Sequence, residues 1–385
     1  NVIRKKNNMK ILTLVERRAD YSRMRPILKE LYNDSFFEIY LVVTGVCLLD
    51  MHGKDVDYIK EDGFLINAEV PMFEEKGRNT NASMVRALSK VLDGIVTEIE
   101  NFQPDLVLTG FDIGANLATT IAAAHMNIPV AHIQGGEVTG TIDESIRHAM
   151  SKFAHIHFPA TEDARDRLIR LGENPDYIFN VGCPSIDTIV QTPKIDKKSL
   201  EKKFNIDFSQ PSILLIQHPV TTESDASRSQ ILTTIEAIKE LDIQALVALP
   251  NNDAGSSEII DEIKKSGLSW YPSLSTDEFV NVYRNIGAIV GNSSSGIHES
   301  STFGIPAVNI GTRQQDRERA LNVIDVGYEK ESIKAGIEKA LFDIEYRKSI
   351  ANIVNPYGDG KSAKRIIELL KTVNLKGIVQ KRFYE

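Results

Sequence analysis

Short apolar runs alternate with longer helical stretches along this chain, and almost every run leads into a polar turn. The first series of predicted strands covers residues 11–15, 37–43, 104–108, 129–133, 155–158 and 178–181, and the helices predicted between them include 24–31, 83–101 and 118–125. Parallel strands need crossover connections, which are usually helices, whereas antiparallel strands can be joined by tight turns. The alternation therefore predicts a parallel sheet with helices on both faces.

A second series of the same kind follows a polar stretch at residues 192–198. Its predicted strands cover residues 213–216, 245–249, 288–290 and 307–310. A chain of 385 residues is long enough for two domains. We therefore predict an α/β protein of two Rossmann-like, doubly wound parallel-sheet domains, at residues 9–190 and 191–375, with a cleft between them. An amphipathic helix predicted near 362–371 could pack back on the first domain.

The charge and hydropathy of the chain exclude several classes of partner. Its formal net charge is −8, and lysines and arginines are mixed with acids along the sequence, which argues against nucleic-acid binding. No apolar run has the length of a membrane span, and the first residues lack the apolar core of a signal peptide. Cys47 and Cys183 are the two cysteines, and such low usage indicates a reducing compartment. We expect a cytoplasmic protein with no membrane partner.

The turn after the predicted strand at 288–290 has the composition of a phosphate site. It reads Gly-Asn-Ser-Ser-Ser-Gly, and a helix is expected from His298 onward. Small residues let backbone N–H groups approach a phosphate, and the hydroxyls of Ser293 and Ser294 add donors. Glu299 could accept from ribose hydroxyls, and Arg313 places a cation after the next strand. On this stretch alone, an ordinary serine-capped turn is an equally good explanation.

A second candidate anion site lies at the end of the first predicted strand. The polar turn at 16–22 contains Arg17, Arg18 and Ser22. Guanidinium groups and a hydroxyl at the carboxyl end of a parallel strand suit an anionic ligand. Taken alone, the turn is better explained as a solvated segment in which Asp20 caps the following helix.

Titratable side chains are densest between residues 132 and 148. Asp143, Arg147 and Ser151 share a helical face, so an acid and a guanidinium could point together into the cleft. The alternatives are a weak surface ion pair for Asp143 and Arg147, and structural roles for His132 and His148. Because these groups follow strand ends that face the predicted cleft, the combination favours a catalytic role.

Together these motifs resemble the hydrolysing UDP-N-acetylglucosamine 2-epimerases, which release N-acetylmannosamine for sialic acid synthesis. The likeness runs from about Met9 to the C-terminus and is carried by residues 18–22, 135–143, 145–148, 217–222, 250–251, 253–256, 291–294, 311–314 and 357–360. The resemblance implies a GT-B-like fold in which the C-terminal domain holds most of the UDP. It also implies a homo-oligomer, and it implies no redox cofactor and no catalytic metal.

The resemblance assigns roles to residues at matching positions. It implies that Ser293, Ser294 and Arg313 contact the diphosphate and that Glu299 contacts the ribose. It also implies that Asn251 lies near the nucleotide and that His218 lies close to the leaving phosphate. Arg18 and Ser22 would reach across from the N-terminal domain. A base would remove the C2 proton while UDP departs, giving a 2-acetamidoglucal, and water would then add with inversion at C2. A C2 proton is weakly acidic, so donors and cations around the diphosphate must supply much of the rate.

The chain departs from the family pattern near the expected base. Where the family typically has Gly-Asp-Arg, this chain has Gly110, Phe111 and Asp112, and Gln134 stands where a glutamate is usual. An amide can hydrogen bond but cannot take a proton at neutral pH. Smaller departures are Cys47 in place of a common histidine and Glu144 in place of an aspartate. The candidate catalytic residues are Asp112, Gln134, Glu137, Asp143, Glu144, Arg147 and His218.

Three explanations of these departures stay open. The remaining acids do the proton transfer, or the substrate differs, or activity is reduced or lost. We predict conversion of UDP-N-acetylglucosamine to N-acetylmannosamine and UDP. The alternatives are the same reaction on a UDP- or GDP-linked diacetamido-trideoxyhexose, a GT-B glycosyltransferase, and a protein that binds a nucleotide sugar without turning it over.

Overall fold

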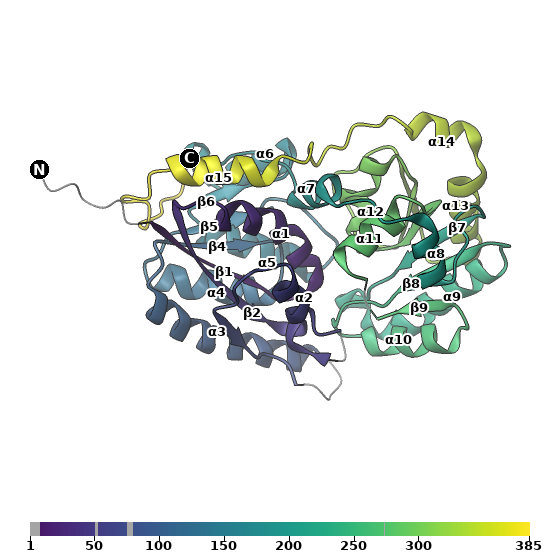
Figure 1. The fold of residues 1–385 in the computed structure, drawn as a ribbon, viewed down its shortest axis with the longest axis horizontal. Helices are drawn as coiled ribbons and strands as arrows, with labels where there is room; N and C mark the ends of the chain where they lie inside the picture. The colour runs from purple at the N-terminus through teal and green to yellow at the C-terminus, as the bar shows by residue number, and fades with distance from the viewer. Residues whose placement is uncertain (1–7, 51–52, 75–79, 273) are drawn as a thin grey trace, which may run out of the picture.

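The computed structural model describes residues 8–50, 53–74, 80–272 and 274–385, and the chain forms two parallel sheets side by side (Figure 1). The first sheet contains β1 (Met9–Val15), β2 (Phe37–Thr44), β3 (Ala68–Val70), β4 (Leu106–Gly110), β5 (Val130–Ile133) and β6 (Ile156–Phe158). The second contains β7 (Ser212–Ile216), β8 (Gln244–Ala248), β9 (Ser269–Tyr271), β10 (Ala288–Gly291), β11 (Ala307–Ile310) and β12 (Val323–Val326). Their orders are β3-β2-β1-β4-β5-β6 and β12-β11-β10-β7-β8-β9. This is the same Rossmann-like order twice, which confirms the predicted fold class.

Helices cover both faces of each sheet (Figure 1). The N-terminal domain contains α1 (Arg18–Tyr32), α2 (Asp55–Glu61), α3 (Asn81–Phe102), α4 (Gly114–His125), α5 (Ile142–Phe153), α6 (Glu162–Arg170) and α7 (Pro184–Gln191). The C-terminal domain contains α8 (Lys197–Phe204), α9 (Ser227–Lys239), α10 (Ser256–Lys265), α11 (Thr276–Tyr283), α12 (Ser295–His298), α13 (Lys330–Phe342) and α14 (Ile344–Ile350). The last helix, α15 (Ser362–Thr372), is described below.

The central strands are apolar at nearly every position because both of their faces are buried. In β1, Ile11 belongs to the core on the side of α1, whereas its neighbour Leu12 belongs to the core under α3. Val91 and Ile95 of α3 complete the second of these cores. Successive side chains of a strand point to opposite faces, so a strand covered on both sides gives a continuous apolar run instead of an alternating one.

The errors of the strand prediction lie at the sheet edges. All predicted strands are present except 178–181, where Ile178 forms only an isolated bridge with His157. Three further strands, β3, β9 and β12, are not predicted from the sequence. They are edge strands of three or four residues with partly exposed side chains. An edge strand has one neighbour and is often short, so its apolar pattern is weak.

Helix α1 begins earlier than the sequence analysis predicts, at Arg18 instead of Met24. The polar turn at 16–22 is therefore largely the first turn of the helix. Asp20 stabilises this start by accepting a hydrogen bond from the backbone N–H of Arg17 at 3.1 Å. An acid three residues after the N-cap can satisfy a free N–H at the helix start. The early start places Arg17 and Arg23 next to the interface between the two domains.

The C-terminal segment returns to the N-terminal domain. Figure 1 shows α15 lying over that domain after a connection from α14 that runs along the top of the molecule. Ile366 and Leu370 of α15 are fully buried in the core beside α1. Asp187 of α7 accepts the backbone N–H groups of Ser362 and Ala363 at 2.9 and 2.8 Å. These carboxylate contacts satisfy free donors at the start of α15.

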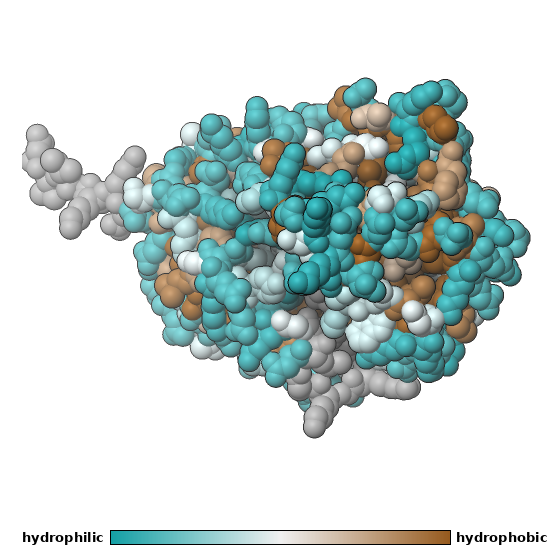
Figure 2. Space-filling model, turned by 45° about the vertical axis from the view of Figure 1, so that its right-hand side comes forward, coloured by the Kyte–Doolittle hydropathy of each residue, from teal (hydrophilic) through white to brown (hydrophobic). Residues whose placement is uncertain are grey.

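The surface of the molecule is largely hydrophilic on the face that Figure 2 shows, with apolar patches mainly on its right-hand side. Exposed apolar side chains of the C-terminal domain include Leu321, Phe342, Ile344 and Val354. In the described part of the chain, no helix combines the length and the apolar character that crossing a membrane requires.

Candidate active site

A cleft lies where the carboxyl ends of the two sheets face each other. Its wall is formed from one side by Arg17, Ala19, Asp20, Arg23, Asp112, Ile113, Thr139 and Asp143, and from the other by His218, Asn251, Ser293, Ser294, Arg313, Gln314 and Arg317. These residues follow β1, β4 and β5 of the first sheet and β7, β8, β10 and β11 of the second. Turns after neighbouring parallel strands meet at one edge of a sheet, where ligands of this fold class bind.

The last position of β10, where the chain enters the turn, requires glycine. Gly291 has φ +123°, and a Cβ there would lie 2.0 Å from the carbonyl oxygen of Ile216. This close approach lets the Asn292 side chain accept the N–H of His218 at 2.7 Å and donate to the His218 carbonyl at 2.9 Å. The turns after β7 and β10 are thereby locked together, with Ser293 and Ser294 on the cleft wall.

The helix that follows this turn differs from the prediction. It begins at Ser295 instead of His298, spans Ser295–His298, and gives way to a 3₁₀ turn at Ser300–Phe303. The Ser293 hydroxyl accepts a hydrogen bond from Ser295 Oγ at 3.1 Å. Glu299 is buried behind the turn and does not line the cleft. Burial raises the pKa of Glu299 to about 7, while the charge of Arg23 acts to lower it.

His218 is held in one tautomer. Its Nδ1 accepts the backbone N–H of Asn251 at 3.0 Å, so the proton of the neutral ring must be on Nε2. Burial, together with the positive charges of Arg313 and Arg17, holds the pKa of His218 well below its usual range. The imidazole is therefore neutral near pH 7, and it can donate a hydrogen bond from Nε2.

Asp112 reaches the cleft through an uncommon backbone turn. The preceding residue, Phe111, has φ +71°, a left-handed conformation that is rare for a bulky side chain. The Asp112 carboxylate is bonded to the Arg147 guanidinium and lies 3.8 Å from Arg317. Burial pushes the pKa of Asp112 up, but Arg147, Arg23 and Arg317 together hold it well below its usual range. Asp112 therefore stays ionised near pH 7.

Glu137 is enclosed behind the cleft wall. It accepts hydrogen bonds from Gln134 Nε2 at 2.7 Å and His298 Nε2 at 3.1 Å, and it pairs with Arg317 at 3.3 Å. Burial would raise the pKa of Glu137, but His298, Arg317 and Arg147 hold it well below its usual range. The carboxylate is 4% exposed and has no free access to the cleft. Gln134 therefore supports Glu137 and lies away from the cavity.

Asp143 differs from Asp112 and Glu137 because its pKa is raised. It lies on the cleft wall at the start of α5, and Arg313 of the other domain is 3.7 Å away. Burial and the neighbouring charge of Asp112 raise the pKa of Asp143 to about 6, against the opposing charge of Arg313. An acid with a pKa near the working pH can both take and return a proton.

Glu144, the next residue, has a different position. Its Oε2 accepts the backbone N–H of Thr139 at 2.7 Å, and its Oε1 lies 3.9 Å from His148. It therefore holds the loop between β5 and α5, and it is absent from the cleft wall. The same loop contacts the other domain directly, because the Gly140 N–H donates to the Arg313 carbonyl at 3.1 Å.

Arg147 and Ser151 also point away from the cavity. Arg147 is 1% exposed, donates to the Glu137 carbonyl at 2.9 Å and pairs with Asp112, so it supports two acids from behind. The neutral His132 ring donates from Nε2 to the Phe111 carbonyl at 3.1 Å, so its Nδ1 accepts a hydrogen bond from the Ser151 hydroxyl at 3.1 Å. Burial lowers the pKa of His132 to about 3, so the ring is neutral near pH 7. His132 therefore has the structural role that the sequence offers as an alternative to catalysis.

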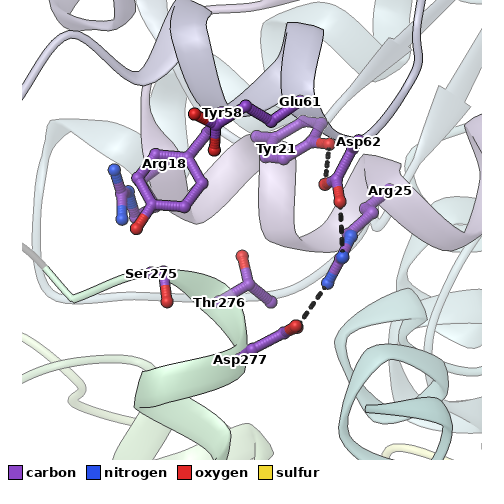
Figure 3. A pocket seen from close by; sticks show the side chains of 9 residues that line it. All are labelled: Arg18, Tyr21, Arg25, Tyr58, Glu61, Asp62, Ser275, Thr276 and Asp277. Carbon is purple, nitrogen blue, oxygen red and sulfur yellow. Dashed lines mark hydrogen bonds and ion pairs between the residues drawn. The ribbon is translucent and has the colours of Figure 1, made fainter. Parts of the chain in front are cut away.

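Arg18 lines a separate pocket between the domains, which Figure 3 shows. Its guanidinium stacks over the Tyr58 ring and donates to the Leu274 carbonyl of the C-terminal domain at 2.6 Å. In the same pocket Arg25 bridges Asp62 and Asp277, again from one domain to the other (Figure 3). Arg18 therefore reaches across the interface, although not into the cleft described above.

The structure divides the candidate residues into three groups. Those on the cleft wall are Asp112, Asp143, His218, Asn251, Ser293, Ser294 and Arg313. Those packed behind it are Gln134, Glu137, Arg147 and Glu299. Arg18, Ser22 and Glu144 lie outside the wall; the backbone carbonyl of Ser22 accepts a hydrogen bond from Thr188.

Sequence reasoning missed three cleft residues of consequence. Arg23 donates to Ser294 Oγ at 3.1 Å across the domain interface, and Arg317 pairs with Glu137. Asp20 also lines the cleft, where burial raises its pKa to about 7. Asp20 is interpreted from the sequence as a helix cap, and Arg23 and Arg317 belong to none of the motifs that the sequence singles out. Within residues 8–50, 53–74, 80–272 and 274–385, no group of three His, Cys, Asp or Glu side chains is placed to hold a metal ion.

Two Rossmann-like domains facing a cleft define a GT-B-like α/β protein. Among solved structures, the UDP-GlcNAc 2-epimerase from Neisseria meningitidis bound to UDP-GlcNAc has this fold, with a TM-score of 0.82 at 22% identity over 95% of this chain and 100% of that one. The sequence profile of the UDP-N-acetylglucosamine 2-epimerase family matches residues 29–371. The chain belongs to this family.

Two curated relatives refine the comparison. The chain is 38% identical over 370 residues to the UDP-N,N'-diacetylbacillosamine 2-epimerase (hydrolyzing) of Legionella pneumophila, covering 95% of this chain and 96% of that protein. It is 29% identical over 339 residues to a UDP-N-acetylglucosamine 2-epimerase of Neisseria meningitidis, covering 86% and 87%. The family likeness is therefore to epimerases of the hydrolysing type.

Proposed function

We propose that the protein hydrolyses a UDP-linked 2,4-diacetamido-2,4,6-trideoxyhexose and inverts its C2 centre, releasing UDP and the free 2-epimeric sugar. The observation that carries the proposal is the pairing of Asp143 with Arg313 at 3.7 Å across the cleft. This pair sets a proton-transfer group beside a cation that follows β11 and donates to the Asn292 carbonyl of the serine-lined turn at 3.1 Å. A site that removes a proton next to a departing diphosphate needs both groups together.

The reaction has two steps in this site. Asp143 takes the proton from C2 while the C1–O bond breaks, so UDP leaves and a C1–C2 double bond forms. A water molecule then adds across the double bond, its hydroxyl to C1 and its proton to C2 on the face opposite to Asp143, and Asp143 gives its proton to solvent. The substrate loses UDP and gains one water, and no electron acceptor is needed.

The opposite wall supports departure of the diphosphate. Arg313, Arg23 and Arg17 bring positive charge to the cleft, and the hydroxyls of Ser293 and Ser294 can donate. His218 adds a neutral N–H donor from Nε2, as its bond with Asn251 dictates. Cations and donors fixed in a site of low water content stabilise charge that develops on a leaving oxygen.

Asp112 and Glu137 keep the site polarised without exchanging protons. Arginines hold Asp112 as an anion, His298 and Arg317 hold Glu137 as one, and the charge of Asp112 contributes to the raised pKa of Asp143. Gln134 fits this scheme because it needs only to donate to Glu137. In this scheme the acid that faces the substrate is Asp143, and it is present although Gln134 replaces the glutamate that is usual in the family.

The choice of sugar rests on the relatives. The 38% identity to the diacetylbacillosamine enzyme exceeds the 29% identity to the UDP-N-acetylglucosamine enzyme, over a larger share of the chain. UDP-N-acetylglucosamine, which the sequence analysis expects, is the second candidate. A proton NMR time course in deuterium oxide, with each UDP-sugar in parallel, tests the proposal.

We expect UDP and a free sugar deuterated at C2 to appear faster from the diacetamido substrate. Faster release of N-acetylmannosamine from UDP-N-acetylglucosamine would reverse the choice of sugar. Binding of both sugars without product would reject the enzymatic role and favour a nucleotide-sugar-binding protein.

A further inference from the structure

A second cavity opens directly from the cleft and has a different chemical character. It has a volume of about 380 Å³ and shares four wall residues with the cleft, Arg17, Asp112, Ile113 and Asp143. Because Asp112 and Asp143 are both in the shared wall, a sugar held over Asp143 would lie at the mouth of this cavity.

The lining of the cavity is mostly apolar. Helix α3 contributes Met84, Val85 and Leu88, and α5 contributes Ile142 and Ile146. Val85 is 66% exposed and Ile142 50% exposed, so this apolar surface is open to water when no ligand is bound. The C-terminal domain adds polar groups to the lining, from Thr221, Thr222 and Asp253. Exposed apolar side chains clustered beside a polar site commonly mark ligand-binding surface.

The order of groups along a nucleotide sugar fits this arrangement. In the proposed function, the diphosphate lies at Ser293 and Ser294, C1 is attached to it, and C2 faces Asp143. C4 lies across the pyranose ring from C1, so its substituent points away from the diphosphate and past Asp143. The apolar cavity shares Asp143 and Asp112 with the cleft wall, so it is the space beside Asp143 that such a substituent would meet. A C6 methyl group would lie beside the same opening.

We propose that this cavity is the subsite for the acylamino group at C4 of the sugar, and that it accepts acyl chains longer than acetyl. The inference rests on the proposed function for the placement of C1 and C2. An acetyl group fills only a small part of a 380 Å³ cavity. Each further methylene would be buried against Met84, Val85 and Leu88, whereas the hydroxyl at C4 of an N-acetylglucosamine unit gains nothing from that surface.

The test compares two synthetic substrates, UDP-2,4-diacetamido-2,4,6-trideoxyglucose and its 4-butyramido analogue. Dissociation constants come from calorimetry at low temperature before turnover, and kcat/KM comes from UDP release. Burial of one methylene strengthens binding roughly fourfold, so two added methylenes give up to about 15-fold tighter binding of the butyramido sugar. We expect the wild-type protein to prefer the butyramido sugar by at least about threefold.

The matched variants are Met84→Gln with Val85→Asn for the cavity, and Leu92→Asn as a control. Leu92 is another exposed apolar residue of α3, 37% exposed, and it lies outside the cavity wall. The double variant should lose the preference for butyramido while keeping its circular dichroism spectrum, and the Leu92 variant should keep both. Equal or weaker binding of the butyramido sugar by the wild-type protein would overturn the subsite.

Turnover and binding separate the two proposals. If both sugars bind with the expected ratio but neither is converted, the proposed function fails and the subsite stands. If the diacetamido sugar is converted but the butyramido analogue is bound no better than it, the function stands and the subsite fails. An unchanged butyramido preference in the double variant would also reject the cavity as the cause.

Discussion

His298 Nε2 lies 3.1 Å from Glu137 Oε2, and both side chains are almost completely buried where the two domains meet. The histidine comes from the end of α12 and the glutamate from the loop after β5, 161 positions apart in the chain. Arg317 pairs with the same carboxylate at 3.3 Å. One buried acid of the N-terminal domain is therefore satisfied largely by two side chains of the C-terminal domain.

Glu137→Gln should destabilise the protein by about 3 kcal/mol, because Arg317 would be left as a buried charge without its closest anion. Urea unfolding followed by fluorescence measures the loss. Glu240→Gln is the control, since Glu240 lies at the surface, where it pairs with Lys330 and Lys334, and its replacement should leave the urea midpoint nearly unchanged. Equal stability of Glu137→Gln and wild type would show that the pair contributes nothing to the folded state.

The free energy of unfolding should fall as the pH is lowered from about 6.5 to 4. Burial, against the charge of Glu137, lowers the pKa of His298 to about 4, so the unfolded chain binds a proton in this range and the folded chain does not. The effect reaches at most about 1.4 kcal/mol per pH unit for one group. Glu137 changes the free energy of unfolding in the same direction. Its pKa is lower in the folded chain than in the unfolded chain, so the stabilisation that it gives at neutral pH is lost as the pH falls below the ordinary pKa of a glutamate.

Urea titrations at pH 4.5, 5.5 and 6.5 measure this slope. His298→Gln keeps a donor for Glu137 and cannot titrate, so its slope should be smaller than that of the wild type. His125→Gln, at an exposed position of α4, should leave the slope unchanged. A slope that is the same in all three proteins would exclude His298 as its source.

Asp143→Asn should lower kcat by at least about 100-fold while UDP still binds, since removal of a general base usually costs two to four orders of magnitude. In the wild type, kcat/KM should fall tenfold per pH unit below about pH 6, because the pKa of Asp143 is raised to about 6 and only its ionised form can take a proton.

Glu144→Gln is the matched control for this prediction. The amide oxygen can still accept the N–H of Thr139, so turnover should stay within about threefold and the break near pH 6 should persist. A reversed outcome, with Glu144→Gln inactive and Asp143→Asn active, would transfer the proton-transfer role to Glu144.

His218→Ala should reduce kcat by roughly 100-fold and leave the fold intact, because it removes one fixed donor from the departing diphosphate. Turnover of the UDP-sugar and circular dichroism measure the two effects. His148→Gln serves as the comparison: this half-exposed histidine of α5 is not on the cleft wall, and its loss should change kcat by less than about twofold. Wild-type turnover in His218→Ala would remove the residue from the mechanism.

Most of the fold and part of the site can be predicted from the sequence. Central strands are recognisable because two buried faces require apolar residues at every position. The edge strands β3, β9 and β12 are not recognised, because their side chains are partly exposed and their apolar pattern is weak. Asp143, His218, Ser293 and Arg313 follow predicted strand ends, and parallel strands bring such turns to one edge whatever the details of packing.

The sequence alone determined that two wound sheets would present polar turns to a common cleft, since periodicity and strand-end chemistry are local properties. Only the tertiary structure decided which of those polar groups face the cavity. In the sequence, Gln134 stands where a base is expected, but in the structure its side chain donates to Glu137. Arg317 and His298 of the other domain contact the same carboxylate and hold it as an anion. Burial and the placement of charges set the pKa of each acid, and both depend on how the two domains pack together.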